Sequence, residues 1–257
     1  MLLKINKLYI SIFLLTICFI SITSVASAQT IKVAAAANLQ SVIGVLGKDF
    51  KQKTGVTVEP IIGSSGKLVA QISNGAPYDV FLSADMDFPA KLAKNGFTDK
   101  PPVVYALGSL IICSTQNIDL KNWTKLIVTD KVSKIAIANA AIAPYGRAAE
   151  EALKKMNLLD KVKPKMVYGE SVSQVNTYIT TGVATLGFTT QSLVMDPANT
   201  TKLNWQPIDP KTYAPIQQGM VLLKNKNGNS APAVKFYQYM LSSSAKSILK
   251  KYGYIIP

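Results

Sequence analysis

Beyond residue 28 the chain alternates short apolar runs with longer amphipathic segments, and this alternation restricts its fold more than any other feature. Residues 31–36 have the composition of a buried strand, and the apolar residues between Leu39 and Phe50 recur at helical spacing. The same order of strand and helix repeats to the end of the chain. It is typical of α/β folds in which mainly parallel sheets carry helices on both faces.

The pattern predicts eight strands and seven helices. The strands are expected at 31–36, 56–62, 79–82, 110–113, 135–138, 166–168, 184–189 and 220–223. The helices are expected at 39–50, 68–72, 88–95, 147–156, 173–181, 233–241 and 245–252.

Two segments, 104–108 and 213–218, are candidate crossings between halves of the molecule. Two crossings predict a discontinuous first lobe, formed by residues 29–106 and 217–257, and a second lobe formed by residues 107–216. A ligand is then expected between the lobes, beyond the carboxyl ends of the strands.

The first 28 residues have the layout of a secretory signal peptide. Lys4 and Lys7 precede the apolar run 8–22, and Ala26-Ser27-Ala28 has the small-residue pattern of a cleavage site. An uncleaved membrane anchor is the alternative, but it needs a longer apolar run. We expect cleavage after Ala28 and a protein in the periplasm.

The composition excludes several classes of function. The chain has no histidine, which removes the catalytic systems that use Ser-His-Asp or Cys-His and the common zinc sites. The net charge is +14, but its lysines are scattered and Arg147 is its one arginine, so no nucleic-acid-binding pattern emerges. Cys113 is the one cysteine outside the predicted signal peptide, which rules out an intramolecular disulfide there. We therefore expect a protein that is not an enzyme and that has no cofactor.

Polar residues stand at four predicted junctions between a strand and a helix. They are Asn38, Ser64-Ser65, Pro144-Tyr145-Gly146 and Glu170-Ser171-Val172-Ser173. A helix N-terminus presents free N–H groups and binds anions readily. The alternative is that these residues only cap helices, which is common at any single junction. Taken together, the four junctions favour a site for a small tetrahedral dianion.

Ser64 and Lys67 also match the S-x-x-K spacing of Ser–Lys hydrolases. No companion S-D-N or K-T-G motif occurs in the chain, and the same segment fails the P-loop pattern because residue 68 is leucine. A secreted Ser–Lys hydrolase thus remains an alternative function. Loss of activity on Ser64→Ala would distinguish it from a binding protein.

Several motifs resemble the periplasmic molybdate-binding proteins. The most specific are AAAANL at 34–39, GSSGKL at 63–68 and GAPYDVFLSAD at 75–85. The resemblance continues through 122–124, 144–146, 186–188 and 251–254. It implies the two-lobed, type II periplasmic-binding-protein fold. It also implies that Asp79 and Asp85, which belong to the third motif, are structural rather than catalytic.

The resemblance implies a ligand, a partner and a set of site residues. The ligand is molybdate or tungstate, delivered by a monomeric protein to the inner-membrane permease of an ABC importer; sulfate or another small oxyanion is the alternative ligand. The implied contacts are Asn38, Ser65, the backbone N–H groups of Tyr145 and Val172, and Thr190. One branch of the family has a tyrosine where this chain has Thr190. Either Thr190 donates in its place, or Asn38 and Tyr145 make up the loss.

Overall fold

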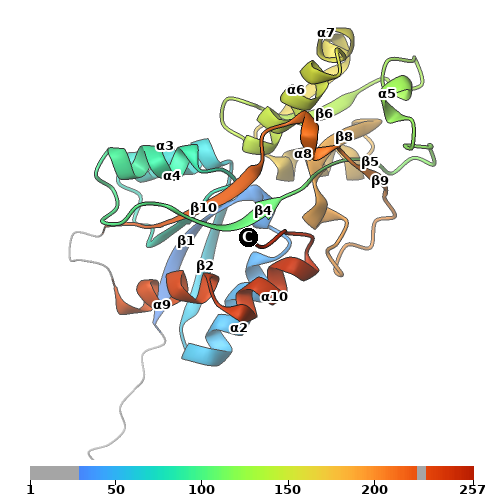
Figure 1. Cartoon of the computed structure of the whole chain (residues 1–257). Coiled ribbons are helices and arrows are strands. Elements are labelled where there is room, and N and C mark those ends of the chain that lie inside the picture. The colour runs from blue at the N-terminus through green and yellow to red at the C-terminus, as the bar shows by residue number, and fades with distance from the viewer. Residues whose placement is uncertain (1–28, 225–229) are drawn as a thin grey trace, which may run out of the picture.

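The computed structural model describes residues 29–224 and 230–257 and has two lobes, each built around a five-stranded sheet (Figure 1). This confirms the predicted α/β, two-lobed fold. The predicted signal peptide and its cleavage site lie outside the described residues. In the described part of the chain, no helix combines the length and the apolar character needed to cross a membrane.

The first sheet has the strand order β2-β1-β3-β10-β4. Its strands are β1 (Thr30–Ala36), β2 (Thr57–Gly63), β3 (Val80–Leu82), β4 (Val103–Gly108) and β10 (Ile216–Leu222). β1 pairs in parallel with β2 and β3, whereas β10 runs antiparallel to both of its neighbours. Four strands therefore point the same way and one is reversed.

The second sheet repeats this arrangement in the order β7-β6-β8-β5-β9. Its strands are β5 (Leu110–Ser114), β6 (Ile135–Ala138), β7 (Met166–Gly169), β8 (Leu186–Thr190) and β9 (Asn204–Pro207). Here β5 is the reversed strand between β8 and β9. Both sheets are thus mainly parallel, as the sequence pattern predicts, with one antiparallel member each.

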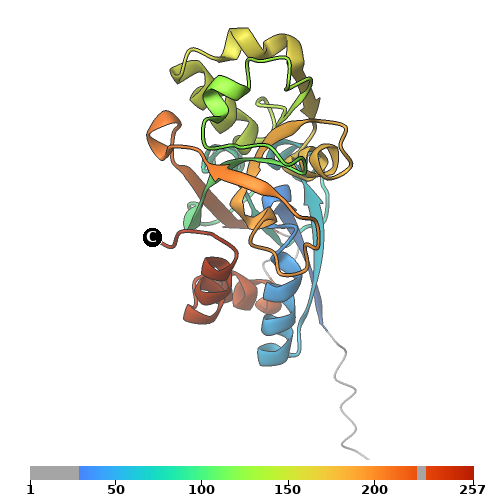
Figure 2. The same ribbon diagram turned by 90° about the vertical axis from the view of Figure 1, so that its right-hand side faces the viewer.

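Helices cover the sheets and connect their parallel strands. They are α2 (Ile43–Thr54), α3 (Ser65–Ser73), α4 (Asp87–Lys94), α5 (Trp123–Leu126), α6 (Pro144–Lys155), α7 (Leu159–Val162), α8 (Val172–Thr180), α9 (Ala231–Met240) and α10 (Ser243–Lys251). The C-terminal helices α9 and α10 lie beside α2 in the first lobe (Figures 1 and 2). The two ends of the chain therefore build one lobe together.

The apolar pattern of the strands explains why helices lie on both faces of the first sheet. Val33 and Ala35 of β1 belong to one buried cluster, which includes Phe50 and Phe236, whereas Ala34 between them belongs to another. Side chains alternate between the two faces of a strand. A continuous apolar run such as β1 must therefore be covered on both sides, which two layers of helices achieve.

Two missed strands and one helix boundary need correction. The sequence pattern does not predict β4 and β9, because it indicates a crossing at residues 104–108 and Asn204–Pro207 is too polar to stand out. β9 is an edge strand and is only partly buried, which explains its weak apolar signal. Helix α6 begins at Pro144 rather than Arg147, because proline is favoured in the first helical turn.

The chain passes between the two sheets twice. A single residue, Ser109, separates β4 of the first sheet from β5 of the second. The chain returns between β9 and β10, and the two reversed strands, β5 and β10, are those that directly follow a passage. The lobe boundaries at 106/107 and 216/217 stay a prediction.

The return of α9 to the first lobe depends on an aromatic cluster. The rings of Phe50 and Phe236 meet edge to face with centroids 5.1 Å apart, and both side chains are buried. Phe236→Ala should lower the free energy of unfolding by about 3–5 kcal/mol because it leaves a cavity in the core. Leu241→Ala, at a residue exposed just beyond α9, should change it by less than about 0.5 kcal/mol. Equal losses in urea unfolding of the two variants would contradict this packing.

Candidate functional site

The two parallel ladders end opposite one another and bring four loops together. The β1–β2 ladder ends at the pair Ala36 and Gly63, and the β6–β7 ladder ends at Ala138 and Gly169. Beyond these ends the chain enters a 3₁₀ turn (Ala37–Leu39), α3, α6 and α8. These are the four junctions that the sequence singled out, two from each lobe.

The four loops line a small cavity that is partly open to solvent. Four of the five residues expected at a ligand site line it, namely Asn38, Ser65, Tyr145 and Val172. The complete lining is Ala36, Ala37, Asn38, Ser64, Ser65, Ala84, Ala143, Pro144, Tyr145, Ser171 and Val172. The fifth expected residue, Thr190, is not part of this lining.

Hydrogen-bond donors are available around this cavity. Ser65, Tyr145 and Val172 stand in the first turns of α3, α6 and α8, where backbone N–H groups have no partner within the helix. In the described part of the chain, these three N–H groups make no other backbone hydrogen bond. The Ser65 Oγ accepts from the N–H of Ala84 at 3.1 Å, which leaves its own hydrogen free to donate. The cavity can therefore supply several donors to one acceptor group.

The cavity is lined by uncharged groups. Tyr145 is the one titratable residue among those that line it, and burial raises the pKa of its phenol well above the usual value. The positive potential must then come from the helices, each of which carries about half a unit charge at its N-terminus. Three α-helices thus supply roughly one and a half units. The 3₁₀ turn at Ala37–Leu39 is too short to add a comparable dipole.

Ser64 and Lys67 are not arranged as a nucleophile and its base. The Ser64 Oγ caps α3 by accepting from the backbone N–H of Lys67 at 3.4 Å. The Lys67 ammonium instead forms an ion pair with Glu170, with Nζ and Oε1 2.8 Å apart. No hydrogen bond joins the two side chains of the S-x-x-K pair, which are both in the described range. The geometry gives the hydrolase hypothesis no support.

The side chain of Asn38 belongs to a buried network between the lobes. Its Nδ2 donates to Gln218 Oε1 at 2.8 Å and to the Tyr254 hydroxyl at 2.9 Å. Its backbone carbonyl accepts from Tyr254 Oη at 2.7 Å and from Ser192 Oγ at 2.9 Å. Asn38 Oδ1 is buried and has no hydrogen-bond partner among the described residues. The amide is therefore held firmly in place, with its NH₂ group already engaged.

Thr190 contributes to the same network rather than to the cavity. Its Oγ1 donates to the Tyr145 hydroxyl at 3.2 Å and accepts from the N–H of Ser192 at 3.3 Å. The Tyr145 hydroxyl also packs against Gly108, where an added Cβ would lie 2.0 Å away. Tyr145 thus offers its N–H to the cavity while its side chain is anchored at the strands that link the lobes. The Thr190 hydroxyl is thus directed at the Tyr145 side chain.

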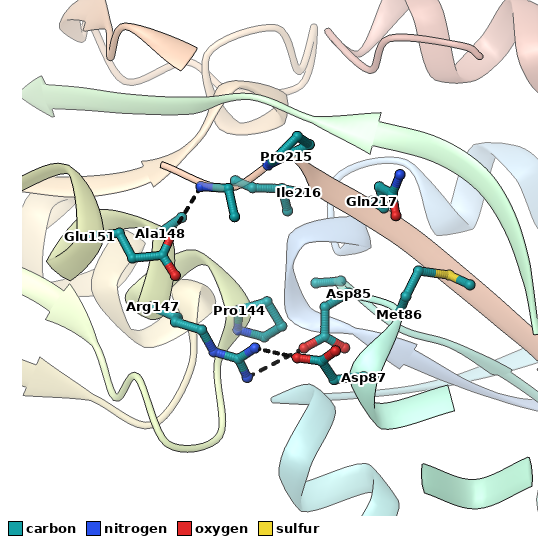
Figure 3. Close-up of a pocket in the computed structure, with 12 residues that line it drawn as sticks. Asp85, Met86, Asp87, Pro144, Arg147, Ala148, Glu151, Pro215, Ile216 and Gln217 are labelled. Carbon is teal, nitrogen blue, oxygen red and sulfur yellow. Dashed lines mark hydrogen bonds and ion pairs between the residues drawn. The ribbon is translucent and has the colours of Figure 1, made fainter. Parts of the chain in front are cut away.

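A larger, open hollow lies beside the cavity and shares Ala84 and Pro144 with it. Figure 3 shows Arg147 reaching across this hollow toward Asp85 and Asp87. The Arg147 guanidinium lies 2.6 Å from Asp87 Oδ2 and 3.5 Å from Asp85 Oδ2. Three carboxylates, including Glu151, line this hollow and would repel an anion. The smaller, uncharged cavity is the better oxyanion site.

The two aspartates of the third motif have structural roles, as expected. Asp85 Oδ1 accepts from the N–H of Phe88 at 3.2 Å and from Ser83 Oγ at 3.1 Å. Burial raises the pKa of Asp85, although these hydrogen bonds and Arg147 oppose the shift. Asp79 Oδ2 accepts from the backbone N–H of Lys32 at 2.8 Å and so joins β1 to the start of β3. Among the described residues, no group of histidine, cysteine, aspartate and glutamate side chains could hold a metal ion.

Sequence reasoning missed several residues that support the site. Gln218 and Ser192 contact Asn38, yet neither lies in a distinctive local pattern. Ala84 contacts Ser65 and lies in the motif at 75–85. Tyr254 and Gly66 also lie in the quoted motifs, which marks them as candidates. Their contact partners, however, could not be predicted from the sequence. Each partner comes from a distant part of the chain.

Comparisons with known proteins agree with this geometry. A family model described as bacterial extracellular solute-binding protein matches residues 31–255. A molybdate-binding protein (ModA) of Rhodobacter capsulatus is 34% identical over 231 residues, which is 90% of this chain and 90% of that protein. The solved periplasmic molybdate-binding protein of Azotobacter vinelandii superposes with a TM-score of 0.83 at 34% identity, over 88% of this chain and 99% of that chain. The sulfate-binding protein SubI of Mycobacterium tuberculosis superposes with a TM-score of 0.74 over 88% of this chain and 86% of that chain. Because the two are only 13% identical, this match shows the shared fold alone.

Thr190 is expected to stabilise the fold through its hydroxyl. Thr190→Val keeps the shape of the side chain but leaves the buried Tyr145 hydroxyl and Ser192 N–H with one partner fewer. The free energy of unfolding should fall by about 1–3 kcal/mol. Thr30→Val, at an exposed threonine in β1, is the matched control and should stay within about 0.5 kcal/mol of the parent. If Thr190→Val unfolded in urea like the parent, the network would have no energetic role.

Proposed function

The chain belongs to the bacterial extracellular solute-binding protein family, and from this premise we propose that it captures molybdate between its lobes and delivers it to the permease of an ABC importer. The observation that carries the proposal is the uncharged cavity at the N-termini of α3, α6 and α8. Relatives named for molybdate, 34% identical over most of their length, support the choice of ion.

In the proposed complex, one oxyanion replaces the missing partners of the buried donors. The backbone N–H groups of Tyr145 and Val172 and the hydroxyl of Ser65 would donate to its oxygens. Asn38 would contribute through its backbone N–H, because its Nδ2 is committed to Gln218 and Tyr254. Hydrogen bonds to a charged group are shorter and about twice as strong as neutral ones. A dianion can then be held without a basic side chain.

Selection against sulfate would rest on the size of the cavity. Both ions are dianions at neutral pH, so neither charge nor protonation separates them. A cage that fits the longer metal–oxygen bonds of molybdate would leave stretched hydrogen bonds around the smaller sulfate. Each unsatisfied buried donor costs about 1–3 kcal/mol. Tungstate has nearly the same size as molybdate and should bind comparably.

The cellular setting is part of the proposal. The N-terminal layout and the periplasmic relatives support export to the periplasm, with cleavage after Ala28. We propose a monomer that uses no cofactor, binds no nucleic acid and performs no catalysis. The excess of lysine would then belong to the solvated surface, since no lysine lines the cavity. Sulfate or another small oxyanion on the same fold is the second candidate ligand.

A panel of oxyanions tests the proposal. Melting temperatures are measured with molybdate, tungstate, sulfate, phosphate and chromate at matched concentrations. Molybdate and tungstate should stabilise the protein by about 2.7 kcal/mol at one hundred times the dissociation constant. Sulfate should give a much smaller shift. Equal affinities for sulfate and molybdate in calorimetry would overturn selection by cavity size.

Ser65→Ala tests the site itself. Removing the hydroxyl deletes one donor to the charged ligand, which is worth about 1.5–3 kcal/mol and should raise the dissociation constant for molybdate about 10- to 150-fold. Ser73→Ala, at an exposed position in the last turn of the same helix, is the matched control and should bind as the parent does. Calorimetric titration of both variants measures the difference. Unchanged affinity in Ser65→Ala would remove Ser65 from the site.

A further inference from the structure

The two lobes touch backbone to backbone directly beside the cavity. Gly66, the second residue of α3, donates its N–H to the carbonyl oxygen of Ile142 at 3.0 Å. Ile142 lies in the loop between β6 and α6, in the other lobe. The chain neighbours of this contact are cavity residues, because Ser65 precedes Gly66 and Ala143 follows Ile142. The contact therefore joins the two rims of the cavity at their closest approach.

No side chain fits at this contact. A Cβ added to Gly66 would lie 2.9 Å from both the Cα and the Cβ of Ile142. The backbone of Gly66 does not have the positive φ that favours glycine, unlike that of Gly55 at the end of α2. An L-residue could therefore occupy position 66 without backbone strain whenever the lobes are apart. The closed arrangement alone requires glycine there.

Other contacts across the cleft are softer. Lys67 pairs with Glu170, and Arg147 pairs with Asp87, but these side chains are at least partly exposed and can reorient. The Ser173 hydroxyl donates to the carbonyl oxygen of Ala37 at 3.4 Å through a similarly movable group. Such contacts favour closure without determining its extent. The contact between Gly66 and Ile142 limits closure more firmly, because it joins two backbones rather than two flexible side chains.

We propose that Gly66 is a positioning residue that sets how far the two lobes close, and with it the reach of the donors on either side of a bound oxyanion. The inference rests on the proposed function. Ser65 and Tyr145 approach the cavity from opposite lobes, and hydrogen bonds to oxygen need heavy-atom distances of about 2.7–3.2 Å. A methyl group at position 66 would hold the lobes apart by several tenths of an ångström and stretch those bonds.

Gly66→Ala should therefore separate binding from stability. The dissociation constant for molybdate should rise about tenfold, equivalent to about 1.4 kcal/mol. The melting temperature of the ligand-free protein should stay the same or rise, because alanine is favoured over glycine in helices. A crystal structure of the molybdate-saturated variant should show residue 66 and Ile142 farther apart than in the saturated parent. A residue with a merely structural role would not combine these three results.

Gly44→Ala is the matched control. Gly44 is exposed in α2 of the same lobe, and an added Cβ would have no atom within 4 Å. This variant should bind molybdate as the parent does. Unchanged affinity in Gly66→Ala, or failure of that variant to fold without ligand, would overturn the role of Gly66 in closure. If the unmodified protein bound none of the oxyanions, the proposed function itself would fail, which is a different and separately visible result.

Discussion

The site depends on one constraint, which is that a buried backbone N–H group needs an acceptor. The first turns of α3, α6 and α8 open onto one small cavity and leave N–H groups there without a protein partner. The strands place these turns, because the β1–β2 and β6–β7 ladders end facing each other. The buried, apolar runs of β1 and β6, which are interior strands of the two sheets, fix these ladders in turn. A group of donors suited to an anion thus follows from how the sheets are built.

The strands that link the lobes connect the donors of one lobe to those of the other. Asn38 of the first lobe bonds to Gln218 in β10, and the Tyr145 hydroxyl of the second lobe packs against Gly108 in β4. Tyr145 and Asn38 therefore both take their position from the strands at which the chain passes between lobes. Each of these two residues is held by contacts on the side that faces away from the cavity. Residues that no ligand touches can therefore determine the shape of the cavity.

Much of the fold was predictable because its signals are local. The buried strand β1, the helix α2 with its end at Gly55 and the returning helices α9 and α10 each have an apolar period that a short stretch of sequence displays. β9 was missed because an edge strand is half-exposed and needs no apolar run. β4 was missed because it joins two lobes, where a loop was expected. The start of α6 was predicted three residues late, because a proline is typical both of a loop and of the first turn of a helix.

The sequence by itself determined the alternation of strands and helices, the four polar junctions and the absence of histidine. Together these restrict the chain to an α/β protein with an uncharged, donor-rich site. Only the tertiary structure decided that the Thr190 hydroxyl donates to that of Tyr145, that Gln218 holds Asn38, and that Gly66 meets Ile142. The physical reason is distance along the chain: Asn38 and Gln218 are 180 positions apart, and no local pattern records which residues closure of the fold brings into contact.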